Sequence, residues 1–310
     1  MADIFSATVI VATLSSGIRL AVPLLLASLG EAFGQRSGVL NLGVDGIMLL
    51  GAFGGYFTTL KTQSPWLGLA VGLGVGLVLG LLSSVISVSL LAEQGISGIG
   101  VYLFGLGMSD LLFQKLVGTP LPAASFQKSP IPFLSEIPVV GDLFFNHSIP
   151  IYLAFLAIPV STVIINRTRF GMNIRAVGEN PEAADSQGIS VTRVRYAAVT
   201  IGGILAGAAG AVLAIGLGIF QQNLTNAQGF IAIALVYFGA WRPLGVMAGS
   251  LVYGMVSAVV LLLKTRGIIP LGASDLAAMI PAVITVLALV VAARRFRAPT
   301  ALTKPFIRGG

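Results

Sequence analysis

The sequence contains no cysteine, one histidine and few charged residues. Without cysteine, the chain cannot form a disulfide, a thiol nucleophile or an iron–sulfur cluster. With only His147, a histidine-rich metal site is excluded, and a Ser-His-Asp triad would depend on that single residue. Charged residues make up 9% of the 310 residues, whereas soluble domains have about 25%. So few charges cannot cover a water-facing surface, which excludes a cytosolic enzyme and a disordered protein.

The hydrophobic content of 56% and the mean hydropathy of +0.96 indicate a polytopic membrane protein. Residues 67–91 and 246–263 are apolar at successive positions rather than at alternate ones, which excludes a β-barrel. Backbone amides in lipid must be bonded within their own segment, so these segments are helices. The N-terminus is not expected to be a signal peptide, because it lacks a basic region and an evident cleavage site. The sequence therefore predicts an all-α fold with about eight to ten transmembrane helices in one domain, residues 1–310.

Apolar runs that approach the length needed to cross a bilayer, about 20 residues, define the expected spans. Residues 228–240 are apolar but short, and are expected to form either a thin, tilted helix or a re-entrant half-helix. The full spans are expected at residues 7–29, 39–59, 67–91, 96–117, 149–166, 196–219, 243–263 and 275–293.

Basic residues gather in two segments, 166–195 and 294–310, and the positive-inside rule places both in the cytoplasm. This distribution also argues against a nucleic-acid-binding surface as the reason for the net charge of +7. An even number of crossings must separate two segments on the same side. Residues 228–240 are therefore expected to cross, which gives nine crossings with the N-terminus outside. The connection 118–148, with five prolines, is then expected to be an ordered external loop.

Several glycines recur every four residues, a spacing that lets helix backbones approach closely in lipid. The favoured interpretation is a compact bundle, and the alternative is that these helix faces slide past one another. The glycines are Gly68, Gly72, Gly76 and Gly80, the pair Gly203 and Gly207, and the pair Gly245 and Gly249.

Three ionisable side chains fall within the expected spans, where a charge is costly: Arg19, Asp45 and Asp110. Arg19 is near the middle of the first span. It is expected either to pair with Asp45 or Asp110, which is the favoured interpretation, or to line a polar path. Two isolated aspartates do not form a proton relay, which would need several acids at matching depth.

Residues 38–46 contain three glycines, and Asn41 and Asp45 lie four positions apart, on one face if the segment is helical. Unwound membrane segments often mark a solute path, because exposed backbone is tolerated only against protein or water. Asn41 and Asp45 are therefore candidate path residues, with a packing role as the alternative. A second polar cluster, residues 221–228, contains Gln222 and Asn223. It is expected to be either a solvated loop or the outer mouth of that path.

The basic segment contains the signals of a short helix. Asn180 followed by Pro181 is a favourable N-cap and first residue, and Gly188 is a natural stop. A helix at residues 181–187 is expected, either as an amphipathic connector or as a docking element.

Small and acidic residues in this segment favour docking on another protein. Ala183 and Ala184 would present a smooth face to a partner's groove, and Glu179 and Glu182 would accept hydrogen bonds from its basic groups.

Three strings in the sequence resemble signatures of one transporter group. Residues 175–189, which contain Glu182-Ala-Ala and Gly188, resemble the EAA loop that docks on the ATPase in ABC-importer permeases. Residues 31–50 and 229–245 are similar to those of nucleoside permeases that work with basic-membrane-lipoprotein binding proteins. The resemblance, to the branched-chain amino acid and ribose permease superfamily, spans roughly residues 31–295. The Ile-x-Leu-Pro part of the EAA consensus is absent after Gly188.

The resemblance implies a permease subunit of an ATP-driven nucleoside importer, in the inner (plasma) membrane with a cytoplasmic C-terminus. A simple-sugar or branched-chain amino acid permease is the alternative, and an ion-coupled secondary transporter is less favoured. The implied partners are ABC ATPase subunits, a second homologous permease, an external substrate-binding lipoprotein and the lipid bilayer, with no nucleic acid. No Gly-x-x-x-x-Gly-Lys-Ser/Thr string, the usual phosphate-binding motif of an ATPase, is present. ATP and magnesium are therefore assigned to the separate ATPase. This chain is expected not to be an enzyme and to bind no cofactor or metal.

Overall fold

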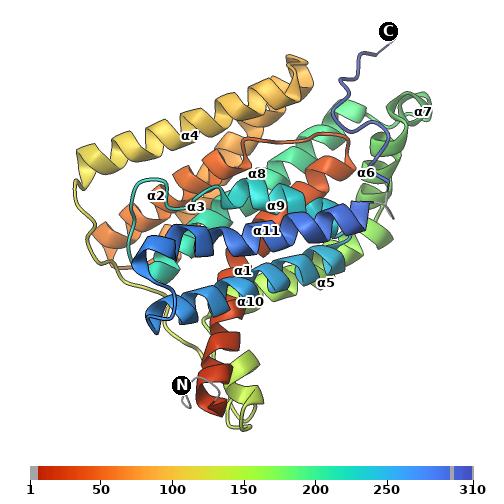
Figure 1. The fold of residues 1–310 in the computed structure, drawn as a ribbon. Helices are drawn as coiled ribbons and strands as arrows, with labels where there is room; N and C mark the ends of the chain where they lie inside the picture. Colours follow the sequence, from red (N-terminus) through yellow and green to blue (C-terminus); the bar gives the residue numbers. More distant parts are fainter. Residues whose placement is uncertain (1–5, 294–296, 309–310) are drawn as a thin grey trace.

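The computed structural model describes residues 6–293 and 297–308, and all the regular elements in that part are helices (Figure 1). This confirms the predicted all-α class. The α-helices are α1 (Ala7–Arg36), α2 (Val44–Thr62), α3 (Pro65–Ser84), α4 (Gln94–Leu116), α5 (Ile149–Arg167), α6 (Arg169–Glu179), α7 (Pro181–Ser186), α8 (Val191–Leu217), α9 (Gln228–Phe238), α10 (Pro243–Thr265) and α11 (Ser274–Ala293). Short π-helical turns occur at Val85–Ser89 and Gly141–Phe145, and a 3-10 turn at Leu271–Ala273.

Six helices in the described residues are long and apolar enough to cross a membrane: α1, α3, α4, α5, α8 and α10. α2 has 19 residues but includes polar ones, and most of it is buried inside the bundle. α9 has only 11 residues, and α11 has a shorter apolar stretch at Leu276–Leu287. The chain is therefore a multi-pass membrane protein, and each predicted span corresponds to one of these helices.

The helix boundaries differ from the expected spans at several points. α1 continues to Arg36, well beyond the predicted end at residue 29. Gly38, with a left-handed backbone angle of +92°, ends α1. Residues 37–43 are not helical, and α2 begins only at Val44. α6 lies in a stretch that was expected to be a connection, whereas α7 agrees with the predicted short helix to within one residue.

The glycine-rich faces pack the centre of the bundle. α8 lies against α1, α2 and α3, and the faces of α3 and α8 meet through glycine. A methyl group on Gly76 would collide with the backbone of Gly203 and Gly207, and one on Gly72 would collide with Ala211. This confirms the compact-bundle interpretation for these two helices. Gly245 instead packs against Gly239, in the turn that precedes α10.

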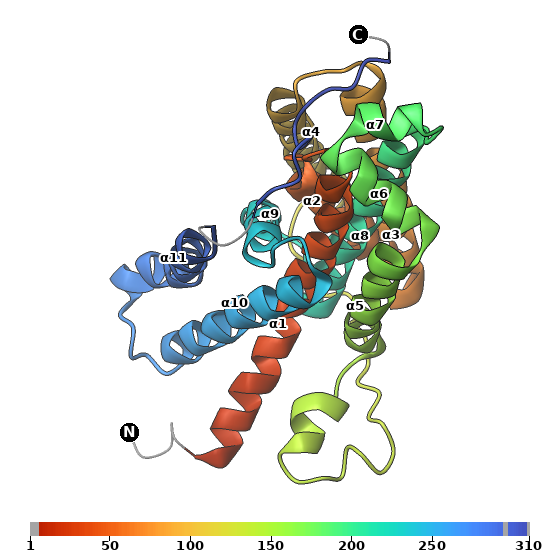
Figure 2. The same ribbon diagram turned by 90° about the vertical axis from the view of Figure 1, so that its right-hand side faces the viewer.

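The bundle has two distinct ends (Figure 2). α6, α7 and residues 297–308 lie at one end, called here the α7 end. The start of α1 and the connection 118–148 lie at the other, called the loop end. The described parts of the two basic segments thus share one end of the molecule. Which side of the membrane that end faces stays a prediction.

The connection 118–148 is held to the bundle by specific bonds. The Tyr56 hydroxyl donates to the Leu121 carbonyl at 2.7 Å, and the Ala123 amide donates to the Gly218 carbonyl at 2.8 Å. Its two arms pair with each other where the Ser129 amide donates to the His147 carbonyl at 2.9 Å. The loop is therefore an ordered part of the fold.

Candidate functional site

Asp45, in the first turn of α2, is the most connected of the predicted path residues. Its side chain has no exposed surface. Oδ1 accepts a hydrogen bond from the Gly229 amide at 2.7 Å, and Oδ2 accepts one from the Thr225 hydroxyl at 3.0 Å. A carboxylate that accepts two hydrogen bonds satisfies donors that would otherwise be costly to bury. Asp45 therefore holds the first turn of α9 and the residues before it.

This contact lies inside the bundle rather than at its surface. Gly46, next to Asp45, packs against Tyr102 and Gly105, and Gly105 is close to the middle of the 23-residue α4. α9 begins at this depth and runs to the α7 end, where the Arg36 side chain donates to the Trp241 carbonyl at 3.0 Å. Residues 218–227 descend without helix from the loop end to this point. The short apolar segment is thus a half-helix, and non-helical chain covers the rest of the distance between the two ends of the bundle. That the two together cross the membrane stays a prediction.

The polar cluster 221–228 is divided by its burial. Gln222 and Asn223 are exposed, and the backbone amide of Asn223 donates a hydrogen bond to Asp110 Oδ1 at 3.3 Å. Thr225 is fully buried against Asp45. The cluster is therefore neither a wholly solvated loop nor a mouth confined to the outer face, because Thr225 enters the bundle although Asn226 and Ala227 after it are exposed.

Asn41 does not share a helix face with Asp45, and that part of the prediction is wrong. Residue 41 precedes α2, in the non-helical stretch, so the spacing of four residues is not a helical turn. The Asn41 Oδ1 accepts a hydrogen bond from the Gly43 amide at 3.0 Å, and this bond stabilises the turn that precedes α2. The structure brings Asp45 to the polar cluster through Thr225, not through Gln222 or Asn223.

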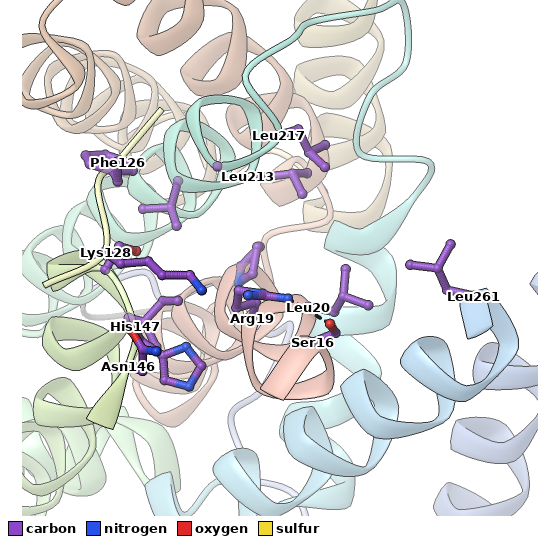
Figure 3. Close-up of a pocket in the computed structure, with 15 residues that line it drawn as sticks. Ser16, Arg19, Leu20, Phe126, Lys128, Asn146, His147, Leu213, Leu217 and Leu261 are labelled. Carbon is purple, nitrogen blue, oxygen red and sulfur yellow. Dashed lines mark hydrogen bonds between the residues drawn. The ribbon is translucent and has the colours of Figure 1, made fainter. Parts of the chain in front are cut away.

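The expected pairing of Arg19 with Asp45 or Asp110 is also wrong. Both aspartates bond residues of the polar cluster, whereas Arg19 Nη2 donates to the Ser16 hydroxyl at 2.7 Å. Arg19 is exposed and lies beside Lys128 at the loop end, away from the middle of the bundle (Figure 3). The long α1 extends past the ends of its neighbours, so the middle of its sequence is not the middle of the fold.

The predicted docking helix has the expected caps. The Asn180 side chain accepts the Ala183 amide at 2.9 Å, and Gly188 has a backbone angle of +81°, which glycine tolerates. Ala183 and Glu182 are exposed, but Ala184 is 4% exposed and packs into the chain's own hydrophobic cluster. The expectation that Ala184 presents a face to a partner is therefore wrong, because it packs inward against the cluster that includes Val191.

The C-terminal segment lies across α6 and α7. The Ala301 amide donates to the Gly178 carbonyl at 2.9 Å, and the Thr300 hydroxyl donates to Glu179 Oε2 at 2.9 Å. The Arg308 guanidinium forms an ion pair with Asp185 at 3.0 Å. Glu179 is thus engaged within the chain, whereas Glu182 projects from the surface. Of the two predicted acceptors for a partner, only Glu182 is exposed without an internal hydrogen bond in the described residues.

The end of α1 connects these elements. Arg195, 2% exposed, donates to the Ser37 carbonyl at 3.2 Å and to the Lys304 carbonyl at 3.0 Å. The Trp241 indole donates to Gln35 Oε1 at 2.9 Å. The end of α1 therefore joins α8, the C-terminal segment and the turn between α9 and α10.

The family of the chain follows from comparison with known proteins. Residues 13–289 match the family described as "Branched-chain amino acid transport system / permease component". The chain belongs to this permease family. The permease is a component of an ABC importer and is not itself the ATPase, and membership implies ATPase and binding-protein partners.

Three relatives are similar over most of the permease. It is 34% identical over 302 residues to the guanosine ABC transporter permease protein NupQ of Bacillus subtilis, which covers 93% of this chain and 94% of the relative. It is 39% identical over 249 residues to a putative glucose ABC transporter permease protein, TsgC13, of Haloferax volcanii, covering 79% and 76%. It is 35% identical over 247 residues to the nucleoside ABC transporter permease protein NupC of Lactococcus lactis, covering 76% and 78%. No solved structure matches the permease.

Gln35, Arg195 and Trp241 were not among the predicted site residues of the permease. Gln35 and Trp241 fall within strings 31–50 and 229–245, which carry the family resemblance, but nothing in the sequence indicates that they touch. Arg195 was counted only as one of the basic residues that set orientation. Its burial depends on the fold of a tail more than 100 positions away.

Proposed function

We propose that this permease moves nucleosides. The observation that carries the proposal is the similarity to the guanosine permease, which extends over nearly the full length of both chains. A second relative with nucleoside in its name adds support.

The chemistry of the candidate path is consistent with a neutral, polar solute. A nucleoside offers hydroxyl groups and ring nitrogens, which hydrogen-bond well to amide side chains such as those of Gln222 and Asn223. We propose that these two exposed side chains contact the solute. Asp45 and Asn41 then act mainly by shaping the non-helical segments beside it, since both already bond the backbone of their surroundings.

We further propose that α7 docks on the ATPase, with the α7 end in the cytoplasm. Residues Asn180, Pro181 and Gly188 set the limits of the helix, and Glu182 and Ala183 provide its exposed surface. The contacts of the α1 end would transmit a movement of α6 and α7 to the turn that follows α9. A second homologous permease and an external binding lipoprotein complete the proposed importer.

A sugar is the second candidate substrate, because the glucose relative is 39% identical over 79% of the chain. The experiment is transport into proteoliposomes that contain the complete importer and its binding protein, with labelled guanosine and labelled glucose in parallel. We expect guanosine uptake that requires ATP and is abolished by a hydrolysis-deficient ATPase. Glucose uptake without guanosine uptake would overturn the substrate proposal, and uptake driven by an ion gradient without ATP would overturn the importer mechanism.

A further inference from the structure

A cavity of about 430 Å³ opens at the loop end, apart from the candidate path (Figure 3). It lies between α1, the start of α5, the last turns of α8 and the loop segment that contains Lys128. Figure 3 shows the Lys128 amine extending toward the Arg19 guanidinium across this space. The cavity therefore brings together two cations from segments more than 100 residues apart in the sequence.

Neither cation forms an ion pair among the described residues. The ion pair in the described residues joins Arg308 to Asp185, at the other end of the molecule. The carboxylate of Asp142 lines an adjoining cavity together with Arg19 and Lys128, but it forms no ion pair with either among the described residues. It accepts a hydrogen bond from the Asn146 side-chain amide at 3.3 Å. Arg19 donates to a neutral hydroxyl, that of Ser16. The cavity thus keeps an excess of positive charge, which favours an anionic occupant.

His147 adds a buried polar group to the same wall. The ring is 2% exposed and its Nε2 lies 2.8 Å from the Leu143 carbonyl, which can only accept, so Nε2 carries the proton. The buried Nδ1 has no hydrogen-bond partner. Burial lowers the pKa of His147 below its ordinary value of 6.5, against the opposing effect of the hydrogen bond to Leu143 and with smaller contributions from Arg19 and Lys128. The ring is therefore neutral at pH 7, and Nδ1 is an acceptor for a hydroxyl group.

Most of the rest of the lining is apolar. Leu20, Ile151, Val212 and Leu213 form the apolar wall, at the level where α5 begins and α8 ends. In a membrane protein the ends of the spanning helices lie near the headgroups of the lipids. A cavity with cations and polar groups on one side and aliphatic side chains on the other fits an amphiphile rather than a wholly polar anion.

We propose that this cavity binds the phosphate headgroup of an anionic phospholipid, with the phosphodiester between Arg19 and Lys128. Phosphate esters pair well with guanidinium and ammonium groups. A glycerol headgroup, as in phosphatidylglycerol, also supplies hydroxyl groups for the polar wall. The volume holds the headgroup and the first carbons of the chains, and the remainder extends along the outer surface of the bundle. This inference does not depend on which solute the permease moves.

The test uses the full-length permease, delipidated in detergent, with native mass spectrometry of added lipid. Phosphatidylglycerol is the probe, and phosphatidylcholine and soluble glycerol phosphate are the comparisons. The variant Arg19→Gln/Lys128→Gln removes both charges, and Arg19→Lys/Lys128→Arg keeps them. Lys61→Gln/Lys115→Gln is the matched control, because these lysines lie near the ends of α2 and α4 and do not line the cavity.

We expect phosphatidylglycerol to bind more tightly than phosphatidylcholine. The charge-removing pair should lose about tenfold or more in affinity, since each basic group contributes substantially to binding an anionic lipid. The charge-keeping and control pairs should bind like wild type. If the charge-removing pair does not fold, Lys128→Gln alone, on an exposed loop position, should still weaken binding by several-fold. Equal binding of the two lipids, or unchanged binding by the charge-removing variants, would overturn the proposal. Equally tight binding of glycerol phosphate would assign the cavity to a soluble phosphate instead.

Discussion

Asp45 Oδ1 accepts a hydrogen bond from the backbone amide of Gly229 at 2.7 Å, so the first turn of α2 holds the first turn of α9. Both helices begin after non-helical chain inside the bundle. A methyl group on Gly229 would collide with the Asp45 backbone, which shows how closely the two turns approach. The contact fixes where the half-helix starts.

Replacing Asp45 with alanine should destabilise the permease by about 2–4 kcal/mol, because two buried donors lose their acceptor. Asp45→Asn should cost less, since its amide can still accept from Gly229 and donate to the Thr225 hydroxyl. Thermal unfolding in detergent measures the difference. Asp110→Ala is the matched control, because the half-buried Asp110 also bonds the polar cluster, but through one longer contact. A cost of Asp45→Ala no larger than that of the control would contradict a holding role.

The substitution Ala183→Arg should reduce transport and co-purification of the ATPase while leaving the fold intact, because Ala183 is exposed on α7. Ala183→Ser, a small change at the same position, serves as the control. Ala184→Arg should instead lower the melting temperature of the permease itself, since it forces a charge into a buried site. Normal assembly and transport by Ala183→Arg would reduce α7 to a connector.

Loss of the buried guanidinium in Arg195→Gln should loosen the C-terminal segment. Hydrogen bonds to charged groups are worth about 1.5–3 kcal/mol each, and Arg195 makes two to carbonyls. We expect faster trypsin cleavage after Arg297, followed by mass spectrometry, and a lower melting temperature. Arg193→Gln, at an exposed position two residues earlier, should behave like wild type. Equal cleavage rates in the two variants would argue against the anchoring role.

The hydrogen bonds of Glu93, at the α7 end, predict that the stability of the permease depends on pH. Its carboxylate accepts hydrogen bonds from the Ile96 and Gly95 amides at the start of α4, and these bonds hold its pKa below the ordinary 4.5. A lowered pKa means that this stabilisation is present above pH 4.5 and is lost as the pH falls through the folded-state value. The melting temperature of Glu93→Gln should therefore be below that of wild type at pH 7, and the gap should narrow toward pH 4. Glu136→Gln, an exposed loop residue, should show no such trend, and a gap independent of pH would contradict the cap.

Local signals in the sequence located the helices well because apolar length and helix caps act within one segment. The Asn180 cap and the Gly188 stop defined α7 nearly to the residue. The four-residue glycine spacing indicated close packing, which the contact of Gly76 with α8 confirms.

The site depended on relations that no local pattern contains. Asp45 meets Gly229 across 184 positions, and Arg195 reaches Lys304 across 109. The spacing of Asn41 and Asp45 suggested a shared face only on the assumption that the helix had already begun. Arg19 was placed in the middle of the membrane because its position in the expected span was taken as its depth. α1 has 30 residues and extends past its neighbours, so the middle of the expected span is not the middle of the bundle.

The path of residues 297–308 over α6 and α7 affects how the permease can be labelled. A fluorescent protein or affinity tag joined behind this segment would stand beside α7 and obstruct any large protein that binds there. A tag placed ahead of α1 would be carried at the opposite end of the bundle. Paired fusions at the two positions would therefore report membrane sidedness, and only the N-terminal one would suit measurements on the assembled importer.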